Sequence, residues 1–83
     1  MWYTTGVRIA ASARRHGIRD EAIDHALSNA IRVVDIDDGL FIIGPNASAQ
    51  LLELTARPTE EGDDFVVFHA MPLRPSNAQR YLP

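Results

Sequence analysis

Histidine and arginine side chains near the two ends of this sequence are the groups best suited to chemistry. Arg14, Arg15 and His16 stand together in the run Arg-Arg-His-Gly-Ile near the start. The corresponding groups near the other end are, in order, His69, Arg74, Arg80 and Tyr81. Imidazole can take up and release protons near neutral pH, and guanidinium groups bind phosphate oxygens. If the fold brings the two ends together, they form a small site suited to a phosphate backbone.

Cleavage of RNA needs only these kinds of group. A base must take the proton of a 2′-hydroxyl, cations must stabilise the crowded phosphate, and an acid must protonate the leaving oxygen. We expect the catalytic residues to be His69, His16 and Arg74. We expect the RNA phosphates to be bound by Arg14, Arg15, Arg80 and Tyr81.

Structural roles would also explain these residues. His69 follows an apolar run and would then be a half-buried histidine bonded to backbone. Arg14 and Arg15 precede a predicted helix end, where the helix dipole favours cations. Arg80 and Tyr81 would then belong to a solvated tail.

Composition excludes several other classes of protein. The 83 residues suffice for one domain, which we expect to span positions 1–83. There is no cysteine, so disulfides and thiolate metal sites are excluded. The three histidines lie far apart in sequence, and no phosphate-loop or dinucleotide motif occurs, so we expect neither metal nor cofactor. No long apolar run or secretory signal is present, so we expect a cytoplasmic protein without membrane contact.

Charge is distributed unevenly along the sequence, although the net charge is only −3. Positions 1–19 carry four arginines and no acids, and positions 65–83 carry two arginines and no acids. Positions 20–64 carry all eleven acids and two arginines, which gives −9. A binding partner could therefore recognise either the basic ends or the acidic middle.

Two helices are expected before any of the main strands. Residues 8–16 favour a helix, which Gly17 would end in a left-handed conformation. A second helix is expected over residues 20–29, with Asp20 as its N-cap. Its buried stripe would consist of Ala22, Ile23, Ala26 and Leu27. Residues 1–7 fit either a short strand or the start of a helix.

Four strands then follow in a pattern typical of an antiparallel meander. They are expected over residues 31–37, 40–43, 49–57 and 65–70, with Asp38-Gly39 as a hairpin turn. Alternation places Glu53 and Thr55 opposite Leu52 and Leu54, and places His69 on the face of Phe65 and Val67. The last strand is almost wholly apolar, so we expect it to be central and covered on both faces. A short helix over residues 76–82, capped by Ser76, or a tail completes the chain.

The predicted fold is therefore α+β. Two N-terminal helices pack on one face of a four-stranded antiparallel sheet, and a short C-terminal helix or tail follows.

This succession of pieces resembles the BrnT-like toxins of bacterial type II toxin–antitoxin systems, within the wider RelE-like group. The matching runs are residues 13–18, Glu21-Ala22, residues 40–44, residues 51–54 and residues 65–70, with Arg74 and Arg80-Tyr81 behind them. The resemblance implies a compact ribonuclease-type fold and an RNA-cleaving toxin that arrests growth. It also implies a functional surface that includes Arg15, His16, Arg74 and Arg80.

The resemblance further implies a set of partners. They are a cognate antitoxin, an RNA substrate that is either free or ribosome-associated, and operator DNA bound only through the antitoxin complex. A homodimer through exposed strand edges is also consistent with the pattern.

Two alternative functions remain open at this point. The chain could be a non-catalytic RelE-like module that acts as a binding partner or co-repressor, because its overall charge is acidic. It could also be an unrelated small α+β regulatory domain.

Overall fold

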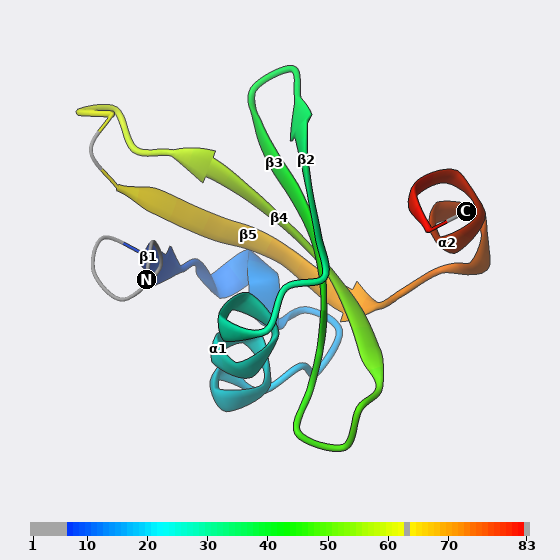
Figure 1. Ribbon diagram of the computed structural model, residues 1–83. Helices are drawn as coiled ribbons and strands as arrows, with labels where there is room; N and C mark the ends of the chain where they lie inside the picture. The colour runs from blue at the N-terminus through cyan, green and yellow to red at the C-terminus, as the bar shows by residue number, and fades with distance from the viewer. Residues whose placement is uncertain (1–6, 63, 83) are drawn as a thin grey trace.

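The computed structural model of the protein describes residues 7–62 and 64–82. The expectation for residues 1–7 therefore lies outside the described part, except at Val7. The elements in chain order are β1 (Val7–Ile9), a 3₁₀ turn η1 (Ala11–Arg14), α1 (Asp20–Ser28), β2 (Arg32–Ile36), β3 (Gly39–Pro45), β4 (Leu51–Pro58), β5 (Phe65–Pro72) and α2 (Pro75–Tyr81). The strands form one five-stranded sheet in the order β1-β5-β4-β3-β2 (Figure 1).

The predicted pair of N-terminal helices and the purely antiparallel four-stranded sheet are both wrong. The structure is a small α+β fold whose sheet is mixed, because β1 pairs in parallel with β5, with Val7 opposite Phe65. Within the described residues, the α-helices are α1 before β2 and α2 after β5. Residues 8–16 do not form the predicted helix. They continue along β5, where Ala10 N donates to Val67 O at 2.9 Å, and then make a single 3₁₀ turn.

The reason is tertiary. The edge of β5 presents backbone groups that need partners, and the N-terminal segment supplies them. Local helix propensity over so few residues is too weak to compete with that pairing.

The other strands lie close to their predicted positions. β2, β3, β4 and β5 follow one another as antiparallel neighbours. The β2–β3 turn is formed by Asp37 and Asp38 rather than by Asp38 and Gly39, because Gly39 already pairs with Ile36. A Cβ at Gly39 would collide with the carbonyl oxygen of Ala56, so the strand requires glycine there.

The main core lies between α1 and one face of the sheet. Ile23, Ala26 and Leu27 of α1 are buried, as predicted. They pack with residues of the sheet that include Leu52 and Leu54. The helix begins at Asp20, but the N-cap position is Arg19 and no side chain caps it.

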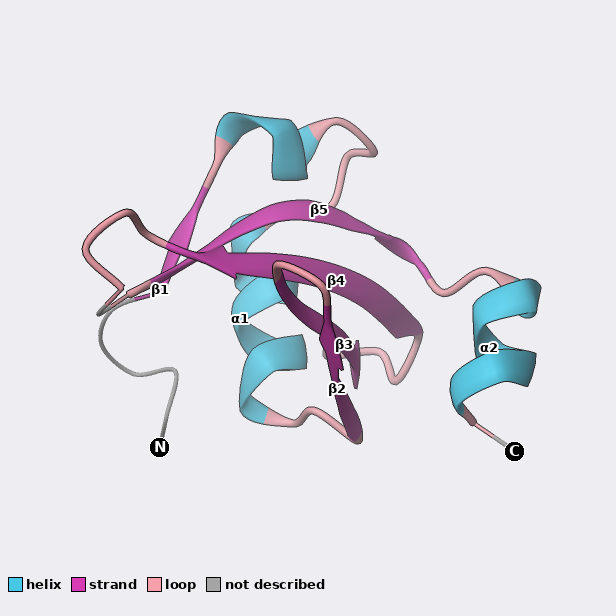
Figure 2. Cartoon of the chain, turned by 90° about the horizontal axis from the view of Figure 1, so that it is seen from above, coloured by secondary structure: helices cyan, strands magenta, loops and turns pink. Residues whose placement is uncertain are grey.

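The second face of the sheet is partly covered by α2 (Figure 2). The ring of Tyr81 lies 4.9 Å from that of Phe41, and Arg32 Nε donates to Tyr81 O at 3.1 Å. The N-cap position of α2 is Arg74 rather than the predicted Ser76. The strand β5 is also not covered on both faces, since only Val67 and Ala70 of its residues are fully buried.

A β-bulge in β5 changes which way His69 points. Opposite β5, Ala56 pairs with Val67, but the adjacent Thr55 pairs with His69, so Phe68 is the extra residue. Val67 and Ala70 both belong to the core. Phe68 and His69 therefore both project to the second face, and the predicted sharing of a face by His69 and Val67 is wrong.

Candidate active site

A hollow of about 410 Å³ lies on the second face, at the place where η1 meets β5. It is lined by Ser12, Arg15, His16, Thr55, Phe68, His69 and Arg74. The fold thus brings the two basic ends of the sequence together, and four of the seven predicted site residues line one hollow: Arg15, His16, His69 and Arg74.

The two imidazoles lie edge to face in the lining of this hollow. The ring centroids of His16 and His69 are 5.8 Å apart, and the ring planes are nearly perpendicular. His16 is placed by the end of η1 and by Gly17, whose φ of +77° turns the chain away directly after it. Ser12 Oγ donates to Phe68 O at 2.8 Å, which joins η1 to the bulge that presents His69.

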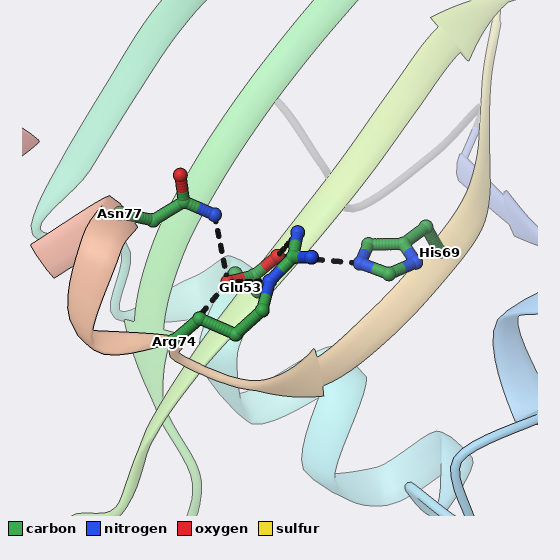
Figure 3. Close-up of polar contacts among 4 residues, drawn as sticks. All are labelled: Glu53, His69, Arg74 and Asn77. Carbon is green, nitrogen blue, oxygen red and sulfur yellow. Dashed lines mark hydrogen bonds and ion pairs between the residues drawn. The ribbon is translucent and has the colours of Figure 1, made fainter. Parts of the chain in front are cut away.

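A buried carboxylate that we did not predict organises the other side of the hollow. Glu53 is fully buried, and its side chain lies among Arg74, Asn77 and His69 (Figure 3). Its Oε1 accepts from the backbone N and Nε of Arg74 at 3.0 and 3.3 Å and from Asn77 Nδ2 at 3.0 Å. Its Oε2 accepts from Arg74 Nη2 at 2.7 Å and lies 3.3 Å from His69 Nε2.

These contacts keep Glu53 ionised. Burial alone would raise the pKa of the Glu53 carboxyl, but the hydrogen bonds from Arg74, Asn77 and His69 outweigh it and lower the pKa from 4.5 to about 2. The hydrogen bond from Arg74 to Glu53 and the attraction between their opposite charges raise the pKa of Arg74. The charge of Arg74 is therefore partly neutralised inside the protein.

The ionised state of Glu53 also fixes the hydrogen on His69. An ionised carboxylate can only accept hydrogen bonds. His69 Nε2 must therefore carry a hydrogen to bond Glu53, and Nδ1 is the free acceptor nitrogen when the ring is neutral.

The remaining predicted site residues lie outside this hollow. Arg14 makes a two-pronged ion pair with Asp20, through Nε at 2.9 Å and Nη2 at 2.8 Å. Arg80 lies over the ring of Tyr81 at 5.5 Å, and Tyr81 packs on Phe41. The structure thus places Arg14 beside α1, and Arg80 and Tyr81 on α2.

Arg15 differs from Arg74, the other arginine that lines the hollow, because Arg74 is paired with Glu53. Within residues 7–62 and 64–82, no acidic side chain lies within ion-pair distance of Arg15, and the residue is exposed. It is therefore available to an anionic ligand.

One signal could have identified Glu53 from the sequence. It is a single acid within the apolar run Leu51-Leu52-Glu53-Leu54, on the face that carries His69 once the bulge is known. An acid in such a strand is rarely buried unless it is paired. The bulge itself has no clear signature in the sequence, so the pairing could not be assigned.

Comparisons of this chain with protein-family models, with curated proteins and with solved structures found no match. In the part of the chain that the structure describes, no three metal-ligating side chains are grouped together. None of the described helices has both the length and the apolar character needed to cross a membrane. Function must therefore be argued from the geometry of the hollow.

Proposed function

We propose that this protein is the toxin of a bacterial type II toxin–antitoxin system and acts as a metal-independent endoribonuclease. The observation that carries the proposal is the hollow in which His16 and His69 lie edge to face, with ring centroids 5.8 Å apart, beside Arg15. A phosphate bound in the hollow over this pair would lie within reach of both imidazoles, one for the attacking oxygen and one for the leaving oxygen. The sequence resemblance to BrnT-like toxins supports the same conclusion.

In this mechanism His69 is the general base. Its Nδ1 takes the proton from a ribose 2′-hydroxyl, and Glu53 stabilises the imidazolium that forms through Nε2. The 2′-oxygen then forms a bond to phosphorus as the bond from phosphorus to the 5′-oxygen breaks. His16 gives its proton to that 5′-oxygen, so the products are a 2′,3′-cyclic phosphate and a 5′-hydroxyl.

The arginines hold the phosphate during this step. Arg15 is free to bind the non-bridging oxygens, and stabilisation of charge that develops there is a large part of catalysis. Arg74 adds positive charge at the other wall, where Glu53 fixes its side chain. In this proposal a cognate antitoxin neutralises the protein, and operator DNA is bound only by the resulting complex.

Growth after tight induction in bacteria tests the proposal. We expect the wild type to arrest growth, and His69→Ala, His16→Ala and Arg74→Ala to relieve the arrest at equal soluble levels. Arg19→Gln is the matched control, because Arg19 is highly exposed and pairs only loosely with Glu21 at 3.6 Å. RNA from arrested cells should carry new 2′,3′-cyclic phosphate ends. Normal growth with the wild type would contradict the proposal.

A second candidate is a non-catalytic interaction module of the same fold. It is favoured by the pairing of Arg74 with buried Glu53, which reduces the positive charge offered to a phosphate, and by the net charge of −3. This candidate predicts normal growth on induction together with a stable antitoxin complex.

A further inference from the structure

A second hollow, of about 590 Å³, lies beside the first one. Phe68 lines both hollows, so the two adjoin at this one side chain. The other residues that matter in the second hollow are Arg8, Arg57, Glu60 and Glu61.

The position of Phe68 is fixed by the bulge in β5. The extra residue lets Phe68 and His69 project to the same face although they are adjacent in sequence. The backbone there is tied to the N-terminal segment by the bonds from Ala10 N to Val67 O and from Ser12 Oγ to Phe68 O. Phe68 is thus a fixed aromatic platform next to His69.

Arg57 completes a flat surface on this platform. Its guanidinium carbon lies 4.1 Å from the centroid of the Phe68 ring, which places the planar cation over the aromatic face. Aromatic rings and guanidinium planes are the surfaces on which proteins stack the unpaired bases of RNA.

The charges around this surface favour a base over a phosphate. Arg8 is already paired with Asp64 at 3.3 Å, and Glu60 and Glu61 line the hollow. Two carboxylates and two arginines thus line the hollow, and Asp64 pairs with one of these arginines, so no net positive charge is left to attract a phosphate. Carboxylate oxygens accept hydrogen bonds from the N–H groups on the edges of bases.

We propose that the second hollow seats the base of a nucleotide next to the scissile phosphate of single-stranded RNA. The base stacks on the Arg57–Phe68 pair, while Arg15 and the two histidines act on the phosphate in the first hollow. This inference rests on the proposed ribonuclease function and extends it to how the substrate is bound.

Binding of short 2′-O-methyl RNA tests the inference, because such RNA cannot be cleaved by attack of a 2′-hydroxyl. The probes are fluorescein-labelled homopolymers of A, C or U, each about eight nucleotides long, and an abasic strand with the same phosphates. For the wild type we expect the best homopolymer to bind about tenfold more tightly than the abasic strand, the gain of one stacked base.

The variants separate the two hollows. Phe68→Leu keeps an apolar side chain without a ring, and Arg57→Lys keeps the charge without a plane. In both variants the ratio of the affinity for the best homopolymer to the affinity for the abasic strand should fall close to one. Circular dichroism checks that the variants are folded. Arg15→Gln should weaken binding of every strand, the abasic one included, and leave that ratio unchanged.

Three results would overturn the inference. If binding depends on Arg15 but the wild type binds the homopolymers no more tightly than the abasic strand, the base site is wrong and the phosphate site stands. The same conclusion follows if Phe68→Leu and Arg57→Lys still bind the homopolymers more tightly than the abasic strand. If the wild type binds none of the strands, both the base site and the proposed ribonuclease function fail.

Discussion

Glu53 is the residue that most changes the interpretation of this site. It receives hydrogen bonds from three side chains and one backbone amide, and it has no exposed surface. It therefore holds Arg74 and His69 in place and also reduces the charge that Arg74 can offer a substrate. A buried carboxylate with this many donors can be removed only at a cost in both stability and geometry.

The first prediction concerns the stability of Glu53→Gln. The folded-state pKa of Glu53 is about 2, below its ordinary 4.5, so the unfolded chain binds more protons between these values. The stabilisation is therefore complete above about pH 4.5 and is lost as the pH falls through about 2. Arg74 is half exposed, so solvent screens part of its interaction with Glu53. We therefore expect Glu53→Gln to lower the free energy of unfolding by about 2 kcal/mol near neutral pH.

Urea unfolding measured at neutral and at acidic pH checks this prediction. The difference between wild type and Glu53→Gln should shrink as the pH approaches the folded-state pKa of about 2. A difference that does not change with pH would mean that the carboxylate is not stabilised by its ionised partners.

The second prediction concerns the hydrogen on His69. Because Glu53 Oε2 is an acceptor 3.3 Å from His69 Nε2, we expect neutral His69 to be the Nε2–H form. In water the neutral ring already favours this form, so the form alone does not test the contact with Glu53. The informative comparison is the rate at which the Nε2 hydrogen exchanges with solvent, which should be slow in the wild type and fast in Glu53→Gln. Nitrogen-15 NMR of imidazole-labelled protein measures this, and fast exchange in both wild type and Glu53→Gln would contradict the assignment.

Among the elements, the bulge in β5 and the turn η1 decide where the site lies. The bulge turns Phe68 and His69 to one face, and η1 follows the parallel strand β1 at the edge of β5. Arg15 and His16 reach the hollow only because this segment lies beside β5 instead of packing as a helix on the core (Figure 1). The opposite face is closed by α1, which approaches β3 closely at Gly44.

The third prediction follows from that close approach. A Cβ at Gly44 would collide with the carbonyl oxygen of Ala26 in α1. We expect Gly44→Ala to lower the free energy of unfolding by about 2 kcal/mol or more, because backbone on both sides must shift. Gly17→Ala is the comparison: it has φ +77° but open space around it, so it should cost only about 1 kcal/mol. Equal losses in urea unfolding would contradict the packing of α1 on β3.

At the scale of the whole molecule, the uneven charge limits how the proposed RNA substrate could be held. The protein carries a net charge of −3, and in the proposed mode only Arg15 and Arg74 face the phosphate. Arg14 and Arg8 are engaged with Asp20 and Asp64. Binding should therefore depend on a few contacts and on base stacking, and only weakly on general attraction.

The fourth prediction is a shallow dependence of RNA affinity on salt. Each phosphate neutralised on a single strand lowers the logarithm of affinity by about 0.7 per tenfold rise in salt. With one or two such contacts, we expect affinity for the 2′-O-methyl strands to fall less than about tenfold between roughly 50 and 200 mM salt. A fall of about a hundredfold would indicate a broad basic binding surface. Fluorescence anisotropy across this range measures it.

The sequence by itself determined the strand meander, the helix α1 and four of the residues that line the candidate site. The sequence shows local patterns: alternating and β-branched runs, the buried stripe of α1 and the left-handed Gly17. Such patterns predict structure correctly where the local preference and the packing of the core favour the same conformation. His16, His69, Arg15 and Arg74 could be chosen from their chemistry alone.

Only the tertiary structure decided how those residues meet. The parallel pairing of β1 with β5 joins positions more than fifty residues apart, and no local propensity encodes it. The bulge at Phe68 depends on the register with β4, and the role of Glu53 depends on that bulge. Backbone pairing across the sheet outweighs weak helix propensity in a short segment. For this reason the residues of the candidate site could be chosen from the sequence, but their arrangement in space could not be predicted.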